Sequence, residues 1–281
     1  MHAQQLFGMA AAAAVLAGFS SAALTDGDWG KYQVGDLRSG YTYAAPETRA
    51  IQDDDFENPA MLALDYGSDL WSTPDGEANK SCADCHADAE DSMKGVGASY
   101  PAYYQPWGKP INVELRINEC RTNNMKAKPW KYESREMLGM TAFVKYQSRD
   151  LPVNVDIGGA NKEFFVKGKD FYYERRGQLD MACKHCHEDN AGNMIRANLL
   201  SQGQSNGFPT YRLKWQGVGS LHRRFRGCNS QVRATPFGYG SDEYVNLELY
   251  LAWRGRGLPV EAPSVPCRPR AASGELQSRF P

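Results

Sequence analysis

Apolar and aromatic residues recur at helical spacing in two stretches of the chain, residues 134–147 and residues 241–254. A return every three or four positions places these side chains on one face of a helix. The pattern therefore predicts two helices, each with one face packed into a core. The residues of these faces are Met137, Met140, Phe143 and Val144 in the first stretch, and Tyr244, Leu247 and Leu251 in the second.

A third apolar run, residues 6–19, is rich in alanine and is followed by the small residues 20–23. Its 14 residues are too few to span a bilayer, which takes about 20 apolar residues in a helix. A short apolar run before small residues is typical of a cleaved export signal. The first basic residue is Lys31, so the usual basic start is missing, and a buried N-terminal helix is the alternative. We predict a signal peptide over residues 1–23 and no membrane span.

The two predicted helices belong to an internal repeat. An offset of 101 residues aligns the segments that precede them, and an offset of 107 residues aligns the helices themselves and the Leu-Pro-Val sequences that follow. Each half therefore has an N-terminal helix, a turn, a loop and a C-terminal helix that packs on the first. The aligned pairs are Gly67 and Gly168, Asp69 and Asp170, Gly76 and Gly177, Cys82 and Cys183, Pro129 and Pro236, Glu136 and Glu243, Arg149 and Arg256, and residues 151–153 and 258–260.

Each half also contains one C-x-x-C-H motif, at residues 82–86 and 183–187. Two thiols separated by two residues on a turn can each add to a vinyl group of one porphyrin, and the next histidine then faces the iron. A structural zinc site is the alternative, but zinc would not require a histidine directly after both second cysteines. We therefore predict two covalently bound haem c groups. The attachment residues are Cys82, Cys85, Cys183 and Cys186, and the histidine ligands of the irons are His86 and His187.

The repeat and the motifs together predict a mostly α fold with two cytochrome c-like domains related by internal duplication. The predicted limits are residues 45–160 for the domain with haem 1, residues 161–262 for the domain with haem 2 and the active site, and residues 263–281 for a C-terminal tail. The tail contains Cys267, which is either free or paired with another chain.

One further cysteine in each half, Cys120 and Cys228, precedes the aligned prolines by nine and eight residues. These cysteines are duplicates of one position, in the loop that should cross the distal face of the haem. We expect both to bind iron as thiolates. A disulfide between them, or two buried thiols, is the alternative. The other candidate ligands are Met125, Met137 and Met140 in the first half and His222 in the second, where we expect His222 to be a packing or surface residue.

The net charge of the chain does not indicate a binding partner, but one local group of arginines does. The chain has 32 basic and 33 acidic residues and a net charge of −1, which favours neither nucleic acid nor a membrane surface. Arg223, Arg224 and Arg226, however, lie directly before Cys228. Guanidinium groups bind oxyanions in bidentate fashion, so these arginines indicate either an anionic substrate, the haem propionates, or solvated side chains.

With these motifs the sequence resembles the SoxA family, the dihaem subunits of the SoxAX cytochromes of bacterial thiosulfate oxidation. The resemblance covers essentially the whole chain after the signal segment. Its specific part is the second cysteine segment, Arg226-Gly227-Cys228-Asn229, with the arginines before it, together with Asn118-Glu119-Cys120-Arg121.

The resemblance implies a periplasmic L-cysteine S-thiosulfotransferase that joins thiosulfate oxidatively to a cysteine of the SoxYZ carrier. Two electrons would pass to the SoxX subunit and then to a small cytochrome c. By the same resemblance Cys120 ligates haem 1, while Cys228 ligates haem 2 and is the catalytic cysteine, commonly a persulfide. Arg224 would bind the substrate.

Two other functions fit the motifs. A dihaem electron-transfer cytochrome without catalysis would need the same haem attachment. A dihaem peroxidase would need an iron open to peroxide, which a cysteine above each haem opposes.

Overall fold

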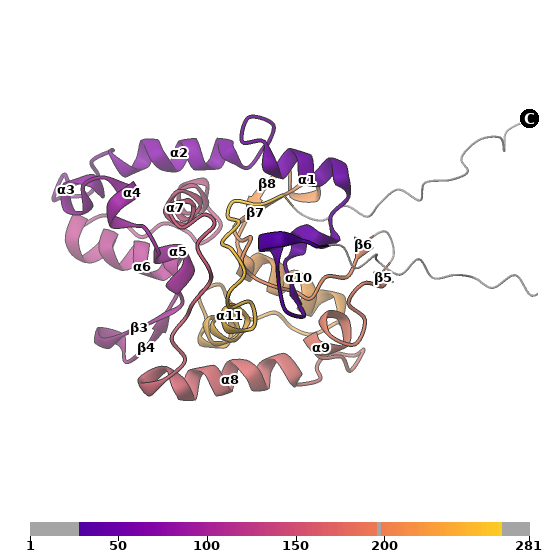
Figure 1. The fold of residues 1–281 in the computed structure, drawn as a ribbon. Coiled ribbons are helices and arrows are strands. Elements are labelled where there is room, and N and C mark those ends of the chain that lie inside the picture. Colours follow the sequence, from indigo (N-terminus) through magenta and orange to yellow (C-terminus); the bar gives the residue numbers. More distant parts are fainter. Residues whose placement is uncertain (1–27, 196–197, 266–281) are drawn as a thin grey trace, which may run out of the picture.

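The computed structural model describes residues 28–195 and 198–265. Two pairs of packed helices form its frame: α2 (Met61–Trp71) with α7 (Arg135–Tyr146), and α8 (Lys162–Tyr173) with α11 (Asp242–Arg254). Helices α2 and α8 lie at opposite edges of the molecule, with α7 and α11 between them (Figure 1). The helices predicted over residues 134–147 and 241–254, and their packing on the N-terminal helix of each half, are confirmed.

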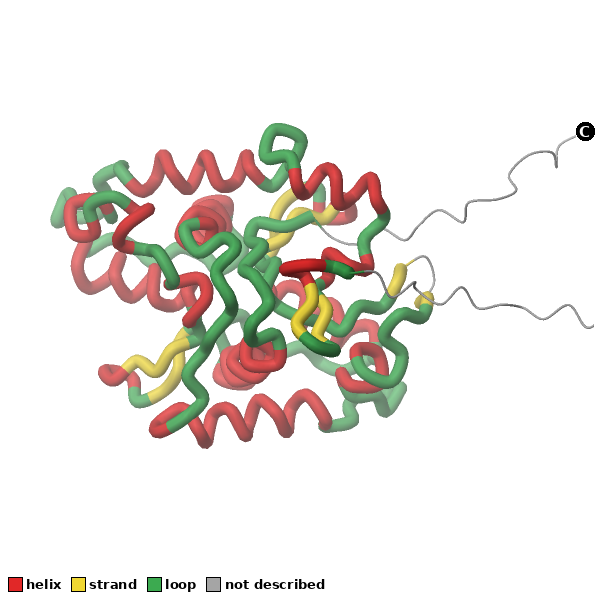
Figure 2. Tube along the Cα trace, in the orientation of Figure 1, coloured by secondary structure: helices red, strands yellow, loops and turns green. Residues whose placement is uncertain are grey.

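The other elements are short, as Figure 2 shows. The remaining helices are α1 (Pro46–Asp53), α3 (Ala83–His86), α4 (Ala89–Ser92), α5 (Val96–Ser99), α6 (Val113–Cys120), α9 (Cys183–His187) and α10 (Leu221–Gln231). The strands pair as antiparallel hairpins: β1–β2 (Gln33–Val34, Leu37–Arg38), β3–β4 (Ala102–Tyr104, Lys109–Ile111), β5–β6 (Met194–Ile195, Asn198–Leu199) and β7–β8 (Thr210–Arg212, Gly217–Gly219). Among the described residues, five short segments are 3₁₀ helices: η1 (Gly30–Tyr32), η2 (Gly40–Tyr43), η3 (Gln105–Trp107), η5 (Gly159–Asn161) and η6 (Leu213–Trp215). One short segment, η4 (Arg121–Met125), is a π-helix.

The aligned glycines of the repeat lie where the helices of each pair cross. A Cβ atom on Gly67 would lie 2.2 Å from the carbonyl oxygen of Gly139, and one on Gly168 would lie 1.9 Å from the carbonyl oxygen of Asn246. A side chain at either position would therefore push the helices apart. The same residue type recurs because both halves use the same close backbone contact.

The duplication extends through the hairpin and helix that carry the distal cysteine. Hairpin β3–β4 and helix α6 correspond to hairpin β7–β8 and helix α10, with an offset of 108 residues. The first half then has one extra residue before the aligned prolines, and η4, a single π-helical turn, directly follows Cys120. Because a π turn holds one residue more than an α turn, it absorbs this residue and keeps the rest of the half in register.

The two halves meet at their repeated Leu-Pro-Val segments. The backbone N–H of Val153 donates to the carbonyl of Leu258 at 2.8 Å, and that of Val260 donates to the carbonyl of Leu151 at 2.9 Å. Both valines belong to one buried apolar cluster that also contains residues of α5 and α11. The duplicated units therefore share a core rather than being joined by a free linker.

The segment before α2 packs on the second half. The Nε2 atom of Gln52, in α1, donates to Glu261 at 2.8 Å, and Ser39 also donates to this buried carboxylate. The backbone N–H of Val265 donates to Gln52 at 3.1 Å. Helix α1 is thus held by residues at the end of the second half and directly after it. The predicted limits of the two domains remain predictions.

Within the described ranges, no helix is both long enough and apolar enough to cross a membrane. The predicted signal peptide, Cys267 and residues 266–281 of the predicted tail lie outside the described residues.

Candidate active site

Each C-x-x-C-H motif lies on a single helical turn, in α3 and in α9. In the first motif the backbone N–H of His86 donates to the carbonyl of Cys82 at 2.9 Å. Residues three and four apart in a helix share a face, so the two thiols and the histidine of each motif point to the same side. This is the donor arrangement that attachment of a haem c requires.

The second motif histidine has a fixed orientation. The Nδ1 atom of His187 lies 2.8 Å from the carbonyl oxygen of Ser201. Since a carbonyl oxygen only accepts, Nδ1 must carry the proton, which leaves the Nε2 lone pair available for iron. Gly203, at φ +72°, permits this approach, because a Cβ atom there would lie 2.7 Å from Cγ of His187. No pattern in the sequence marks Ser201 or Gly203 as a neighbour of His187.

Cys228, on α10, faces His187. Its sulfur lies near the imidazole of His187, and the charges of Arg224 and Arg212 also act on it. Burial alone would raise the pKa of Cys228, but Arg224, His187 and Arg212 together lower it to about 7. The structure therefore brings together three predicted residues, Cys228, His187 and Arg224, and adds Arg212 to them.

Cys120, the duplicate of Cys228, lies in a different electrostatic environment. Burial raises the pKa of Cys120, and the charge of Arg116, four residues earlier, is opposed by the carboxylate of Glu119. Cys82 and Cys85 of the first motif are close enough to interact with it electrostatically. The two cysteines occupy equivalent positions, but only Cys228 has its thiolate form stabilised.

The three arginines before Cys228 have different contacts. Arg223 pairs with Glu133 at 3.7 Å and lies over the ring of Trp215. Arg226 donates to the carbonyl of Phe237 and lies over the ring of Tyr239. Arg224 is the one of the three that most strongly stabilises the Cys228 thiolate. The structure thus gives different surroundings to three arginines that their spacing alone does not distinguish, and it places Arg224, the one singled out by the family resemblance, near the sulfur.

Two alternatives from the sequence are not supported. All six described cysteines have free thiols, so the Cys120–Cys228 disulfide is wrong. In the part of the chain that the structure covers, no group of three or more His, Cys, Asp or Glu side chains could hold a metal ion together, as the zinc alternative requires. Met137 and Met140, candidate ligands in the first half, are fully buried in α7.

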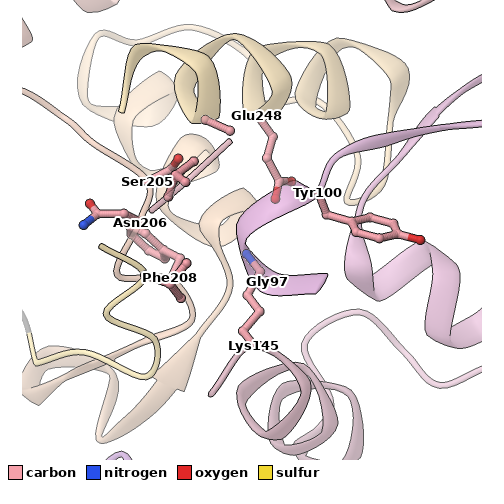
Figure 3. Close-up of a pocket in the computed structure, with 10 residues that line it drawn as sticks. Gly97, Tyr100, Lys145, Ser205, Asn206, Phe208 and Glu248 are labelled. Carbon is pink, nitrogen blue, oxygen red and sulfur yellow. The ribbon is translucent and has the colours of Figure 1, made fainter. Parts of the chain in front are cut away.

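His222 is buried between the two halves, as the packing interpretation predicts. Its ring stacks on Tyr132, its Nδ1 accepts from the backbone N–H of Gly240 at 3.0 Å, and its Nε2 lies 3.2 Å from Glu248. Glu248 and Lys145 also line a small pocket between the halves (Figure 3). Burial and the nearby Glu248 carboxylate raise the pKa of Glu114 to about 7.

The second half also has an open pocket of about 530 Å³, lined by Arg176 and Phe237 among others. Phe237 and Cys183 pack against the same apolar cluster, and the charge of Arg176 acts on Cys183. The residues present that fit a haem are the two thiols of the motif and the oriented histidine.

A duplicated helical frame, with one C-x-x-C-H turn per half and a cysteine on a later helix of the same half, defines a cytochrome c-type protein with two cytochrome c-like units. A family model described as SoxA/TsdA, cytochrome c domain, matches residues 66–153 and 167–260. These ranges confirm the predicted fold class and its duplication. The chain belongs to the SoxA family.

Named relatives and a solved structure agree with this assignment. The chain is 49% identical to the L-cysteine S-thiosulfotransferase subunit SoxA of Pseudaminobacter salicylatoxidans, over 81% of this chain and 80% of the relative. It is 46% identical to the same subunit of Rhodovulum sulfidophilum, over 82% and 80%. A crystal structure of SoxXA from P. pantotrophus matches with a TM-score of 0.79 and 46% identity, over 82% of this chain and 86% of that chain. The predicted enzyme class, an L-cysteine S-thiosulfotransferase subunit, is confirmed.

Proposed function

We propose that the chain is exported to the periplasm and carries two covalently bound haem c groups, with which it couples thiosulfate to a cysteine thiol of the SoxYZ carrier. Haem 1 would be attached at Cys82 and Cys85, and haem 2 at Cys183 and Cys186. SoxX would be its partner subunit, as in the related SoxXA structure, and a small cytochrome c would take the electrons.

The axial ligands follow from the same proposal. His86 and Cys120 would bind the iron of haem 1, and His187 and Cys228 the iron of haem 2. The proximity of Cys228 to His187 supports the second pair, because two ligands of one iron must face each other. A bound haem would supply a one-electron acceptor beside the reacting sulfur.

The overall coupling is an oxidation: R–SH + S₂O₃²⁻ → R–S–S–SO₃⁻ + H⁺ + two electrons. One S–S bond forms, the thiol loses its proton, and both electrons leave through the cytochromes. Cys228 would provide the sulfur that takes up the sulfane sulfur of thiosulfate and passes the product to the carrier thiol. Arg224 would bind the oxyanion end of thiosulfate.

The observation that carries this proposal is the environment of Cys228, whose thiolate is stabilised by Arg224 and His187. Replacement of Cys228 by Met keeps a sulfur ligand for iron but removes the nucleophile. Turnover of thiosulfate with the carrier and a cytochrome acceptor should then fall to background, while the haem absorption spectrum stays that of a six-coordinate iron.

Cys120→Met is the matched control, since it makes the same substitution at the duplicated position. It should retain substantial activity if haem 1 lies off the electron path. Near-normal turnover of Cys228→Met would refute the catalytic assignment and leave an electron-transfer cytochrome. Loss of activity in Cys120→Met alone would place the reaction in the first half.

A further inference from the structure

The side chains around Cys120 form a group without net charge. Arg116 pairs with the buried carboxylate of Glu119 at 2.5 Å. Tyr104, at the end of β3, completes the group: its hydroxyl donates to Glu119, and the guanidinium of Arg116 lies 4.9 Å from the centre of its ring. The side chain of residue 104 therefore reaches both residue 116 and residue 119, and the one positive charge is balanced by the one negative charge.

The second half keeps this geometry but changes the charge. Residue 212 ends β7 as residue 104 ends β3, and the two hairpins have the same register. Residues 224 and 227 are three apart on α10, as residues 116 and 119 are on α6. At these positions the second half has two positive charges and no carboxylate. The equivalent pairs are Arg116 and Arg224, Glu119 and Gly227, and Tyr104 and Arg212.

Packing within the chain does not require the glycine at position 227. No atom of the described residues lies within 4 Å of the place that its Cβ would occupy. Glycine is also, after proline, the least favourable residue in the interior of a helix. The most direct consequence of a glycine at position 227 is electrostatic. A carboxylate at this position would reach the guanidinium of Arg224, as Glu119 reaches Arg116.

Arg212 has a defined place beside this site. Its guanidinium lies 5.1 Å from the centre of the ring of Trp215, in the turn η6 that joins the two strands of the hairpin. Arg223 lies over the same ring at 4.6 Å. The hairpin therefore brings the guanidinium of Arg212 to the ring against which Arg223, the residue before Arg224 on α10, also lies.

We propose that Arg212 and Gly227 are specificity-determining residues, which together convert the neutral arrangement of the first half into a site for a dianionic oxyanion. This inference rests on the proposed function and deepens it. Arg212 supplies a second guanidinium beside Arg224, and Gly227 removes the carboxylate that neutralises the equivalent arginine. Two guanidinium groups match the two negative charges of thiosulfate, and the position of the cysteine places its sulfur at the same site.

The test compares Gly227→Glu with Gly227→Gln in the haem-loaded complex with SoxX. The two side chains have nearly the same size and shape, so their difference reports the charge alone. Gly227→Glu should raise the KM for thiosulfate about tenfold or more above that of Gly227→Gln, while kcat and the haem absorption spectrum differ little. The decline of the rate with ionic strength should also be flatter in Gly227→Glu, because less net positive charge attracts the substrate.

Arg212→Tyr and Arg212→Lys provide a second comparison that leaves α10 untouched. Arg212→Tyr, which restores the residue of the first half, should raise the KM at least several-fold more than Arg212→Lys, which keeps the charge. Equal KM values within both pairs of variants would overturn this inference and leave the proposed function standing. A wild-type complex without thiosulfate-dependent turnover would overturn both.

Discussion

Removal of the guanidinium of Arg224 tests whether this residue binds the substrate. Arg224 is half-buried on α10 and acts directly on the sulfur of Cys228. A charge-assisted hydrogen bond in such a place contributes about 1.5–3 kcal/mol. Since about 1.4 kcal/mol corresponds to a factor of ten in rate, Arg224→Ala should lower kcat/KM for thiosulfate roughly 10- to 150-fold. The assay is the initial rate of cytochrome reduction by the haem-loaded complex at subsaturating thiosulfate.

Arg223→Ala is the matched control, one residue away on the same helix. The side chain of Arg223 is 37% exposed and its ion pair with Glu133 is 3.7 Å long. Such a pair contributes about 1 kcal/mol or less, so the loss in kcat/KM should stay below about fivefold. If Arg224→Ala instead left these kinetics unchanged and shifted the haem spectrum or potential, the arginine would belong to a haem propionate and the reasoning would be wrong.

Three further results are expected. The intact mass of the purified mature protein should equal that of two haems plus the polypeptide that remains after removal of about 23 N-terminal residues. A zinc-loaded protein without haem, from cells able to attach haem, would refute the assignment of the two C-x-x-C-H motifs to haem. The folded-state pKa of Glu114 is raised to about 7 from an unfolded value near 4.5, so the folded form binds its proton more tightly and stability is lost as pH rises through this window. Glu114→Gln should reduce the fall in the free energy of unfolding between about pH 4.5 and 7 by about 1–3 kcal/mol, measured by denaturant unfolding, and an unchanged fall would contradict the raised pKa. Gly67→Ala should destabilise the protein by about 1–3 kcal/mol because its methyl group would overlap the Gly139 backbone, whereas Gly238→Ala, with open space around it, should have little effect on thermal unfolding.

The local sequence determined the long helices and the C-x-x-C-H turns of this protein. The helices predicted over residues 134–147 and 241–254 are observed as Arg135–Tyr146 and Asp242–Arg254. Ser134 and Ser241 precede them as N-cap residues. Apolar periodicity and capping act over a few residues, so they can be read without knowledge of the fold. The C-x-x-C-H motifs are equally local, since one helical turn contains all of their ligands.

The repeat also predicted relations between residues far apart in the sequence, because a duplicated sequence folds into a duplicated structure. It correctly paired the helices of each half and identified Cys120 and Cys228 as equivalent. It could not indicate how the halves meet. Their contact through the Leu-Pro-Val segments, and the packing of Gln52 against Glu261, join residues far apart in sequence that no local pattern relates.

The tertiary structure decided which charges reach the reactive sulfur. The spacing of Arg223, Arg224 and Arg226 does not distinguish them, but in the structure their side chains meet different partners. The charge of Arg212 also acts on Cys228, although Arg212 lies on β7 and Cys228 on α10. Electrostatic interactions depend on distances between side chains, and distances between separate elements are set by the packing of the whole fold.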